Sequence, residues 1–169
     1  MKVKNILVEI KSDKEVFEDL KKTVREIKAG KKLTVTNGQM TRFLLPLDQA
    51  IDLVLFALVK GKNGDMYVKK APSCTIETLA KAICSLFKYN KGYEIVGFRA
   101  GEKMHETLVS MEEMTRAIDL GDYFRIPSES QDLDYNKYHL HGDGINTKSI
   151  KPYTSENTTQ LTERSTVEF

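Results

Sequence analysis

A single arginine stands in a short apolar segment of the chain. Arg42 lies between Met40 on one side and Phe43 and Leu44 on the other. An arginine among apolar neighbours is seldom left without an anion, because an uncompensated charge withdrawn from water is costly. Two interpretations are open. The anion is either an internal carboxylate, for which Asp48 is a candidate, or a bound phosphate, which the planar guanidinium can hold with two parallel hydrogen bonds.

A second charged group follows a predicted strand that ends at Phe98. In the segment Arg99–Lys103, Gly101 allows a sharp turn, so Arg99 and Glu102 can reach one ligand from a single loop. A cation for phosphate beside a carboxylate for sugar hydroxyls suits a nucleotide. An ordinary charged surface turn has the same spacing, so this alternative also stays open.

The remaining patterns indicate no metal site and no catalytic residue. His139, His141 and Asp143 could share one face of a strand, but no further ligand follows at a recognised metal-site spacing. Cys74 and Cys84 form neither a disulfide framework nor a metal motif. The pattern of a phosphate-binding loop is absent, and no nucleophile stands out.

Alternating strands and helices must position these residues. Apolar, β-branched runs predict strands over residues 3–10, 33–36, 65–69 and 93–98. Helical spacing predicts helices over residues 13–29, 46–60, 75–87 and 111–118. The buried stripe of the second helix is predicted to comprise Ile51, Val54, Leu55 and Leu58. Beyond residue 127 this periodicity fades, and we expect irregular structure with disorder growing towards Phe169.

This alternation predicts an α/β fold of mixed α+β type, in which helices cover a small mixed sheet. We place an α/β domain over residues 1–127, in which the strand near Leu33 pairs with a neighbour. An irregular extension follows over residues 128–169.

Composition narrows the class of protein further. The chain has 169 residues, of which 40% are hydrophobic and 30% charged, as expected for one packed domain. Its longest apolar run, Leu53–Val59, is far shorter than the ~20 residues of a membrane-spanning helix. The net charge of +2 is low for a nucleic-acid binder. Without a signal-peptide pattern at Met1, we expect a cytoplasmic protein with neither nucleic acid nor membrane as partner.

Several segments, taken in order, resemble one bacterial family. They are Lys32–Thr36, Met40–Phe43, Asp48–Phe56, Gly64–Asp65, Lys70–Pro72, Arg99–Lys103, Glu106–Leu108, Asp119–Tyr123 and Arg125–Pro127, followed by residues 132–138 and 153–158. Together they are similar to the C-terminal, substrate-binding half of capsule and surface-polysaccharide enzymes. These are UDP-N-acetylglucosamine 4,6-dehydratases and UDP-glucose 4-epimerase-like proteins, which are extended short-chain dehydrogenase/reductases. The resemblance covers residues 28–165.

The resemblance implies a UDP-sugar ligand and roles for three residues. Arg42 matches the arginine that grips the pyrophosphate, Arg99 a second phosphate arginine, and Glu102 the carboxylate that binds the ribose. The family's full-length enzymes use NAD(P), bound by a Gly-rich strand–turn–helix, and a Tyr-x-x-x-Lys pair that accepts the sugar hydroxyl proton. Neither pattern occurs here, so we expect a chain that is inactive alone and requires a Rossmann-fold partner.

Three hypotheses follow. The chain is the substrate-binding part of such an enzyme, a non-catalytic nucleotide-sugar-binding module, or a decayed remnant that acts as a scaffold. Without a Rossmann half, an apolar surface would be left uncovered, and this predicts association with a partner or with a second copy of the chain.

Overall fold

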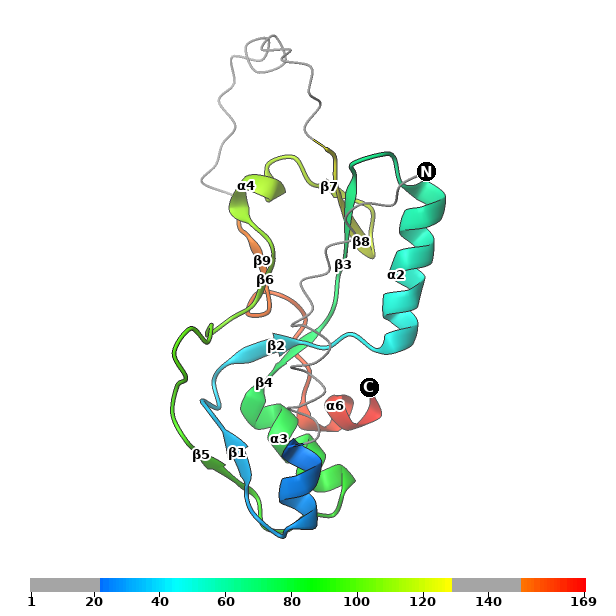
Figure 1. Cartoon of the computed structure of the whole chain (residues 1–169). Helices are drawn as coiled ribbons and strands as arrows, with labels where there is room; N and C mark the ends of the chain where they lie inside the picture. Colours follow the sequence, from blue (N-terminus) through cyan, green and yellow to red (C-terminus); the bar gives the residue numbers. More distant parts are fainter. Residues whose placement is uncertain (1–21, 129–149) are drawn as a thin grey trace. The chain divides into compact units, whose positions relative to one another are not determined.

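The computed structural model describes residues 22–128 and 150–169, which divide into two compact units (Figure 1). Unit 1 contains residues 47–70, 107–128 and 150–153, and unit 2 contains residues 22–46, 71–106 and 154–169. The strand predicted over residues 3–10, the start of the first predicted helix and the His139 group lie outside the described residues. The domain boundary predicted after residue 127 stays a prediction.

Unit 2 is built around two small sheets. β1 (Leu33–Val35) pairs in parallel with β5 (Tyr93–Ile95), and β2 (Thr41–Phe43) pairs antiparallel with β4 (Ser73–Thr75). The strands at β1 and β5 were predicted, whereas β2 and β4 were missed because three residues carry too little alternation to be recognised. The β2–β4 register places Arg42 opposite Cys74.

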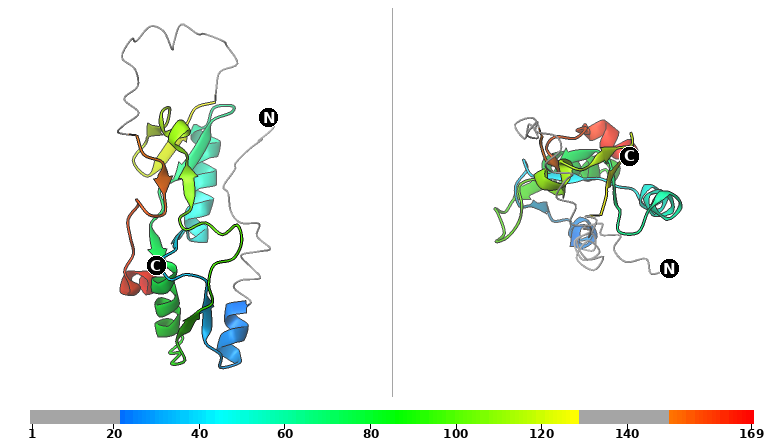
Figure 2. Two further views of the ribbon diagram at one scale, coloured as in Figure 1. Left: turned by 90° about the vertical axis from the view of Figure 1, so that its left-hand side faces the viewer. Right: turned by 90° about the horizontal axis from the view of Figure 1, so that it is seen from above.

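Helices flank these strands. Residues 22–28 are helical, in the region predicted for the first helix. α3 (Ile76–Leu86) begins where β4 ends, because the side chain of Thr75 accepts a hydrogen bond from the Thr78 backbone N–H at 3.1 Å and so caps the helix. α6 (Glu163–Glu168) lies beside α3 (Figure 2).

The expectation of irregular structure near the C-terminus is wrong for residues 150–169. These residues include β9 (Tyr153–Thr154), the fully buried Ser155 and helix α6, which Thr162 begins with a capping box. Hydroxyl and amide side chains hold this segment in place by hydrogen bonding to backbone N–H and carbonyl groups. The segment is therefore ordered although its sequence has no apolar periodicity. For example, the Gln160 side chain donates to the Ser155 carbonyl at 2.9 Å.

Unit 1 has an antiparallel sheet in the order β3-β8-β7. Its strands are β3 (Met66–Lys69), β8 (Tyr123–Ile126) and β7 (Ile118–Asp119). β6 (Thr107–Val109) pairs with β9, and the short helix α4 (Met111–Met114) follows β6. The helix predicted over residues 111–118 is therefore too long, since the chain returns to strand at Ile118. The core of unit 1 comprises Val68, Val109, Phe124 and Ile126.

Helix α2 (Leu47–Lys60) uses one face to pack within unit 1. Leu53 is buried, and the Phe56 ring stacks on Tyr123 with centroids 4.2 Å apart and meets the edge of Tyr67 at 5.6 Å. The predicted buried stripe is wrong for Ile51, Leu55 and Leu58, which are exposed. The helix is apolar on two faces, and periodicity alone could not tell which face packs.

The length and hydropathy of the described helices bear on membrane insertion. Within residues 22–128 and 150–169, α2 included, every helix is too short or too polar to span a bilayer.

The aromatic contacts of α2 give a test of this packing. We expect Phe56→Ala to lower the free energy of unfolding by about 2–3 kcal/mol, because it removes the Tyr123 stack and the Tyr67 edge contact together. Leu55→Ala, one residue away on the exposed face, should change it by less than about 0.5 kcal/mol. Urea denaturation of the two variants measures both effects, and a larger loss for Leu55→Ala would contradict the assigned orientation of α2.

Candidate functional site

The guanidinium of Arg42 is bound by the chain's own backbone. Its Nη1 donates to the carbonyls of Thr41 and Met104 at 2.8 and 3.3 Å, and its Nη2 donates to the carbonyl of Lys103 at 3.0 Å. The backbone N–H of Thr41 in turn donates to the Met104 carbonyl at 3.0 Å. Strand β2 and the loop over residues 102–106 are thereby fixed to each other.

Two carboxylates complete the surroundings of Arg42. Glu106 Oε1 lies 3.4 Å from Nε, and Glu102 Oε1 lies 3.7 Å from Nη2. The arginine side chain is only 16% exposed, so these ion pairs are partly shielded from water. Of the two interpretations left open by the sequence, the structure shows the internal ion pair, but its partners are Glu102 and Glu106 instead of Asp48.

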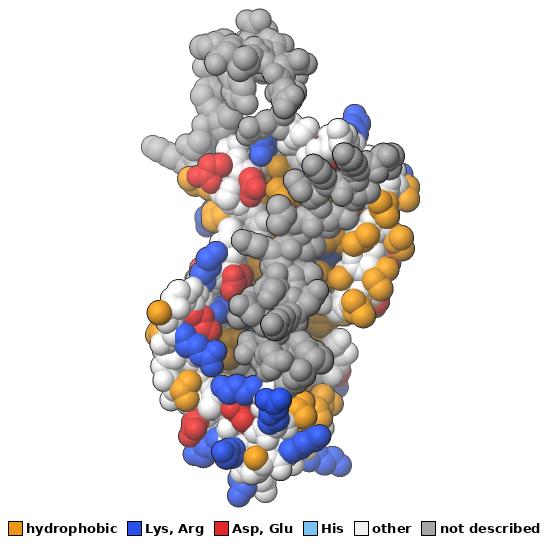
Figure 3. Space-filling model, in the orientation of Figure 1, with side chains coloured by type: hydrophobic (Ala, Val, Ile, Leu, Met, Phe, Trp, Pro, Cys, Tyr) orange, Lys and Arg blue, Asp and Glu red, His pale blue; other side chains and the backbone are white. Residues whose placement is uncertain are grey.

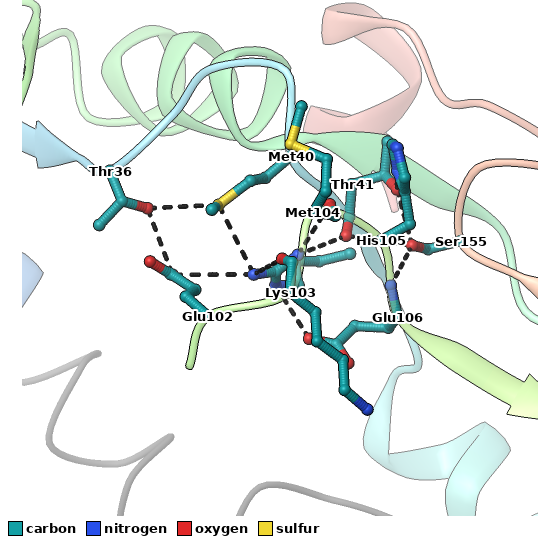
Figure 4. A network of polar contacts seen from close by, with 10 residues as sticks. Thr36, Met40, Thr41, Glu102, Lys103, Met104, His105, Glu106 and Ser155 are labelled. Carbon is teal, nitrogen blue, oxygen red and sulfur yellow. Dashed lines mark hydrogen bonds and ion pairs between the residues drawn. The ribbon is translucent and has the colours of Figure 1, made fainter. Parts of the chain in front are cut away.

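Glu102 has one carboxylate oxygen with a partner and one without. Its Oε1 accepts a hydrogen bond from Thr36 Oγ1 at 3.2 Å, as Figure 4 shows. Its Oε2 is buried and has no hydrogen-bond partner among the described residues. Buried carboxylate oxygens are usually satisfied, so this one can accept a hydrogen bond from a ligand hydroxyl.

Arg99 lies at the start of the same loop and is exposed. Gly101 adopts a left-handed conformation with φ of +81°, and the Glu102 backbone N–H donates to the Arg99 carbonyl at 3.2 Å, so the chain turns sharply here as the sequence predicted. Within the described part of the chain, the Arg99 guanidinium makes no hydrogen bond or ion pair. The structure thus brings Arg42 and Glu102 together and leaves the Arg99 side chain in solvent.

A buried hydroxyl network supports the site, and sequence reasoning missed it. Thr41 Oγ1 lies 2.6 Å from Ser155 Oγ and 2.8 Å from His105 Nδ1 (Figure 4). Ser155 Oγ also accepts from the Glu106 backbone N–H at 2.8 Å and donates to the Thr41 carbonyl at 3.1 Å. Ser155 and Thr41 are 114 positions apart, so no local pattern could have shown this contact.

The shifted pKa values of one cysteine and two tyrosines oppose nucleophilic or phenolate chemistry at these residues. Burial raises the pKa of the Cys74 thiol, which therefore stays protonated. A hydrogen bond to Glu77 at 2.7 Å raises the pKa of the Tyr93 phenol, and desolvation raises that of Tyr89. A tyrosine that accepts a sugar hydroxyl proton requires a lowered pKa. Among residues 22–128 and 150–169, His, Cys, Asp and Glu also form no cluster of three that could hold a metal.

Comparisons with known proteins now define the class of protein. The fold resembles the X-ray structure of Pen from Bacillus thuringiensis with a TM-score of 0.68 and 26% identity, covering 88% of this chain and 43% of that one. This likeness confirms the mixed α/β fold, with small sheets and helices, of a short-chain dehydrogenase/reductase-like protein.

The family itself follows from sequence. Residues 20–128 match the family described as polysaccharide biosynthesis protein, and the chain belongs to this family. It is 46% identical over 138 residues to proteins named UDP-glucose 4-epimerase from Rickettsia typhi and Rickettsia rickettsii. These matches cover 82% of the chain, but the chain spans only 40% of the length of these curated relatives.

The buried hydroxyl network can be tested by removing one oxygen. We expect Ser155→Ala to lower the free energy of unfolding by about 1–3 kcal/mol, because the Glu106 N–H loses its acceptor inside the protein. Ser85→Ala, an exposed control, should stay within about 0.5 kcal/mol of the wild type. Equal effects of the two substitutions in thermal or urea unfolding would show that Ser155 does not hold the loop.

Proposed function

We propose that the chain is the UDP-sugar-binding part of a nucleotide-sugar 4,6-dehydratase or 4-epimerase for capsule or another surface polysaccharide. NAD(P) binding and hydride transfer then belong to the portion of the family protein that the chain does not span. The names of the relatives support the substrate class. The observation that carries the proposal is Glu102, a carboxylate paired with Arg42, whose buried Oε2 has no hydrogen-bond partner among the described residues.

Each residue has a distinct role in this proposal. Arg99 reaches a phosphate from solvent, where its side chain has no competing partner among the described residues. Glu102 accepts hydrogen bonds from ribose hydroxyls through Oε2. Arg42 contributes to the pyrophosphate site when a phosphate replaces one of its two carboxylate partners. The partner replaced is Glu106, so that the ion pair between Arg42 and Glu102 is kept.

One observation favours a second candidate function. All three guanidinium nitrogens of Arg42 already have acceptors within the chain. With all of these acceptors inside the chain, Arg42 can have a purely structural role. The chain would then be a scaffold, or a non-catalytic module whose Arg42 does not bind a pyrophosphate. The two functions differ in what the loss of each arginine does to ligand affinity.

Calorimetric titration with UDP-N-acetylglucosamine tests the proposed function. Charge-assisted hydrogen bonds contribute about 1.5–3 kcal/mol each, so a partial site with two arginines should bind near the millimolar range. Arg99→Ala should weaken binding about tenfold or more without changing the free energy of unfolding, because the side chain is exposed. Lys91→Ala, at another exposed position, is the matched control. Absence of binding to the folded wild-type chain would contradict the proposal.

A separate substitution distinguishes a ligand role of Arg42 from a purely structural one. We expect Glu106→Gln to tighten UDP-N-acetylglucosamine binding severalfold, because it removes the carboxylate that competes with phosphate for Nε. The same substitution should lower the free energy of unfolding slightly. Glu94→Gln, at an exposed position of β5, controls for the change in net charge. If Glu106→Gln leaves the affinity unchanged, Arg42 only fixes the loop.

A further inference from the structure

One end of unit 2 consists of two turns that lie side by side (Figure 1). Residues 28–32 run from the helix of residues 22–28 to β1, and residues 86–92 run from the end of α3 to β5. The Tyr89 hydroxyl donates to the Lys31 carbonyl, and the Leu33 N–H donates to the Gly92 carbonyl at 3.0 Å, so the two turns are joined. We call them the basic tip, because all of their charged residues are lysines, namely Lys28, Lys31, Lys32, Lys88 and Lys91.

The positive charge of the basic tip is not neutralised locally. All five lysines are exposed, and no ion pair joins them to a carboxylate within residues 22–128 and 150–169. Of the neighbouring carboxylates, Glu26 is engaged 3.7 Å from Lys22 Nζ, and Glu94 and Glu163 lie beyond the two turns. The ammonium groups are therefore free to meet an anionic partner.

The charge of the chain is unevenly distributed. The chain has a net charge of +2, so five lysines in two turns leave −3 for all its other residues together. Figure 3 shows Lys and Arg side chains gathered at the end of unit 2 where Figure 1 labels α3, β1 and β5. The low net charge led to the expectation that neither nucleic acid nor a membrane is a partner. A net charge does not report such a concentration of cations, which attracts anionic surfaces.

Two large apolar side chains lie directly beside these lysines. Leu86 and Phe87 are 60% and 57% exposed, and they immediately precede Lys88. The last turn of α3 holds them in place, because the Phe87 N–H donates to the Ile83 carbonyl at 3.0 Å and the Tyr89 N–H to the Cys84 carbonyl at 2.7 Å. Exposed apolar side chains bordered by lysines are typical of proteins that lie on an anionic bilayer.

We propose that the basic tip binds the surface of an anionic lipid bilayer. The lysines attract the phosphate groups of the lipid heads, and Leu86 and Phe87 enter the boundary between the heads and the acyl chains. A nucleic acid would also attract the lysines, but its charged backbone offers no apolar layer for Leu86 and Phe87. The contact is reversible and sensitive to salt, since its electrostatic part is screened. It goes beyond the proposed function and uses no residue of the candidate site.

Cosedimentation of the full chain with vesicles tests the electrostatic part. We expect binding to vesicles of equal parts phosphatidylglycerol and phosphatidylcholine, weakened by added salt, and none to phosphatidylcholine alone. Lys88→Ala combined with Lys91→Ala should lower the affinity about 25-fold, since each lysine near an anionic surface contributes about fivefold. Lys60→Ala combined with Lys62→Ala removes the same charge from exposed positions of unit 1 and should leave the affinity unchanged.

A substitution without a change in charge tests the apolar part. Phe87→Ser should lower the affinity for the anionic vesicles about tenfold, because the bilayer no longer covers the aromatic ring. Phe98→Ser, at a phenylalanine that is 60% exposed outside the basic tip, is the matched control and should have no effect. Circular dichroism and thermal unfolding establish that each variant is folded. Single-stranded DNA serves as a second anionic probe.

Three outcomes would overturn the proposal. The first is a folded wild-type chain that does not bind the anionic vesicles. The second is an equal loss of binding in the two double lysine variants, which would mean that charge acts without regard to its position. The third is binding to single-stranded DNA as tight as to the vesicles together with no effect of Phe87→Ser on vesicle binding, which would identify a nucleic-acid surface instead.

Discussion

The positive charge of Arg42 sets the main constraint on unit 2. A guanidinium largely withdrawn from water needs acceptors around it, since an unpaired charge in such a place costs several kcal/mol. The carbonyls of Lys103 and Met104 can serve only if the loop over residues 102–106 runs beside β2. One side chain thus determines the path of the loop that carries Glu102. The stability of unit 2 and the placement of Glu102 are therefore coupled through Arg42.

Family membership alone does not define the chemistry of the chain. A fold supports many activities, and function depends on the geometry of the site. Here the loop presents an exposed cation at Arg99 and a partly buried carboxylate at Glu102. The thiol of Cys74 and the phenol of Tyr93 are held in their neutral forms.

The sequence predicted local structure better than long-range contacts. Helix α3 was predictable because apolar spacing and a capping threonine act within a few residues of each other. The need of Arg42 for an anion was also predictable, since it depends on the neighbours of the arginine. The identity of that anion was not, because Glu102 and Glu106 lie far along the chain. Ser155 was missed for the same reason, and α2 was misoriented because both of its faces are apolar.

The hydrogen bonds between β4 and residues 159–161, which lie far along the chain, have a consequence for biosynthesis. The Ser73 N–H donates to the Thr159 carbonyl at 2.9 Å, and the Leu161 N–H donates to the Ser73 carbonyl at 2.7 Å. The Gln160 side chain, 87 positions beyond Ser73, bonds to its hydroxyl. At ~5–20 residues per second, a ribosome needs roughly 4–17 s to make that intervening chain. During this interval β4 lacks the partners that residues 159–161 supply, so unit 2 is completed only after those residues have left the ribosome.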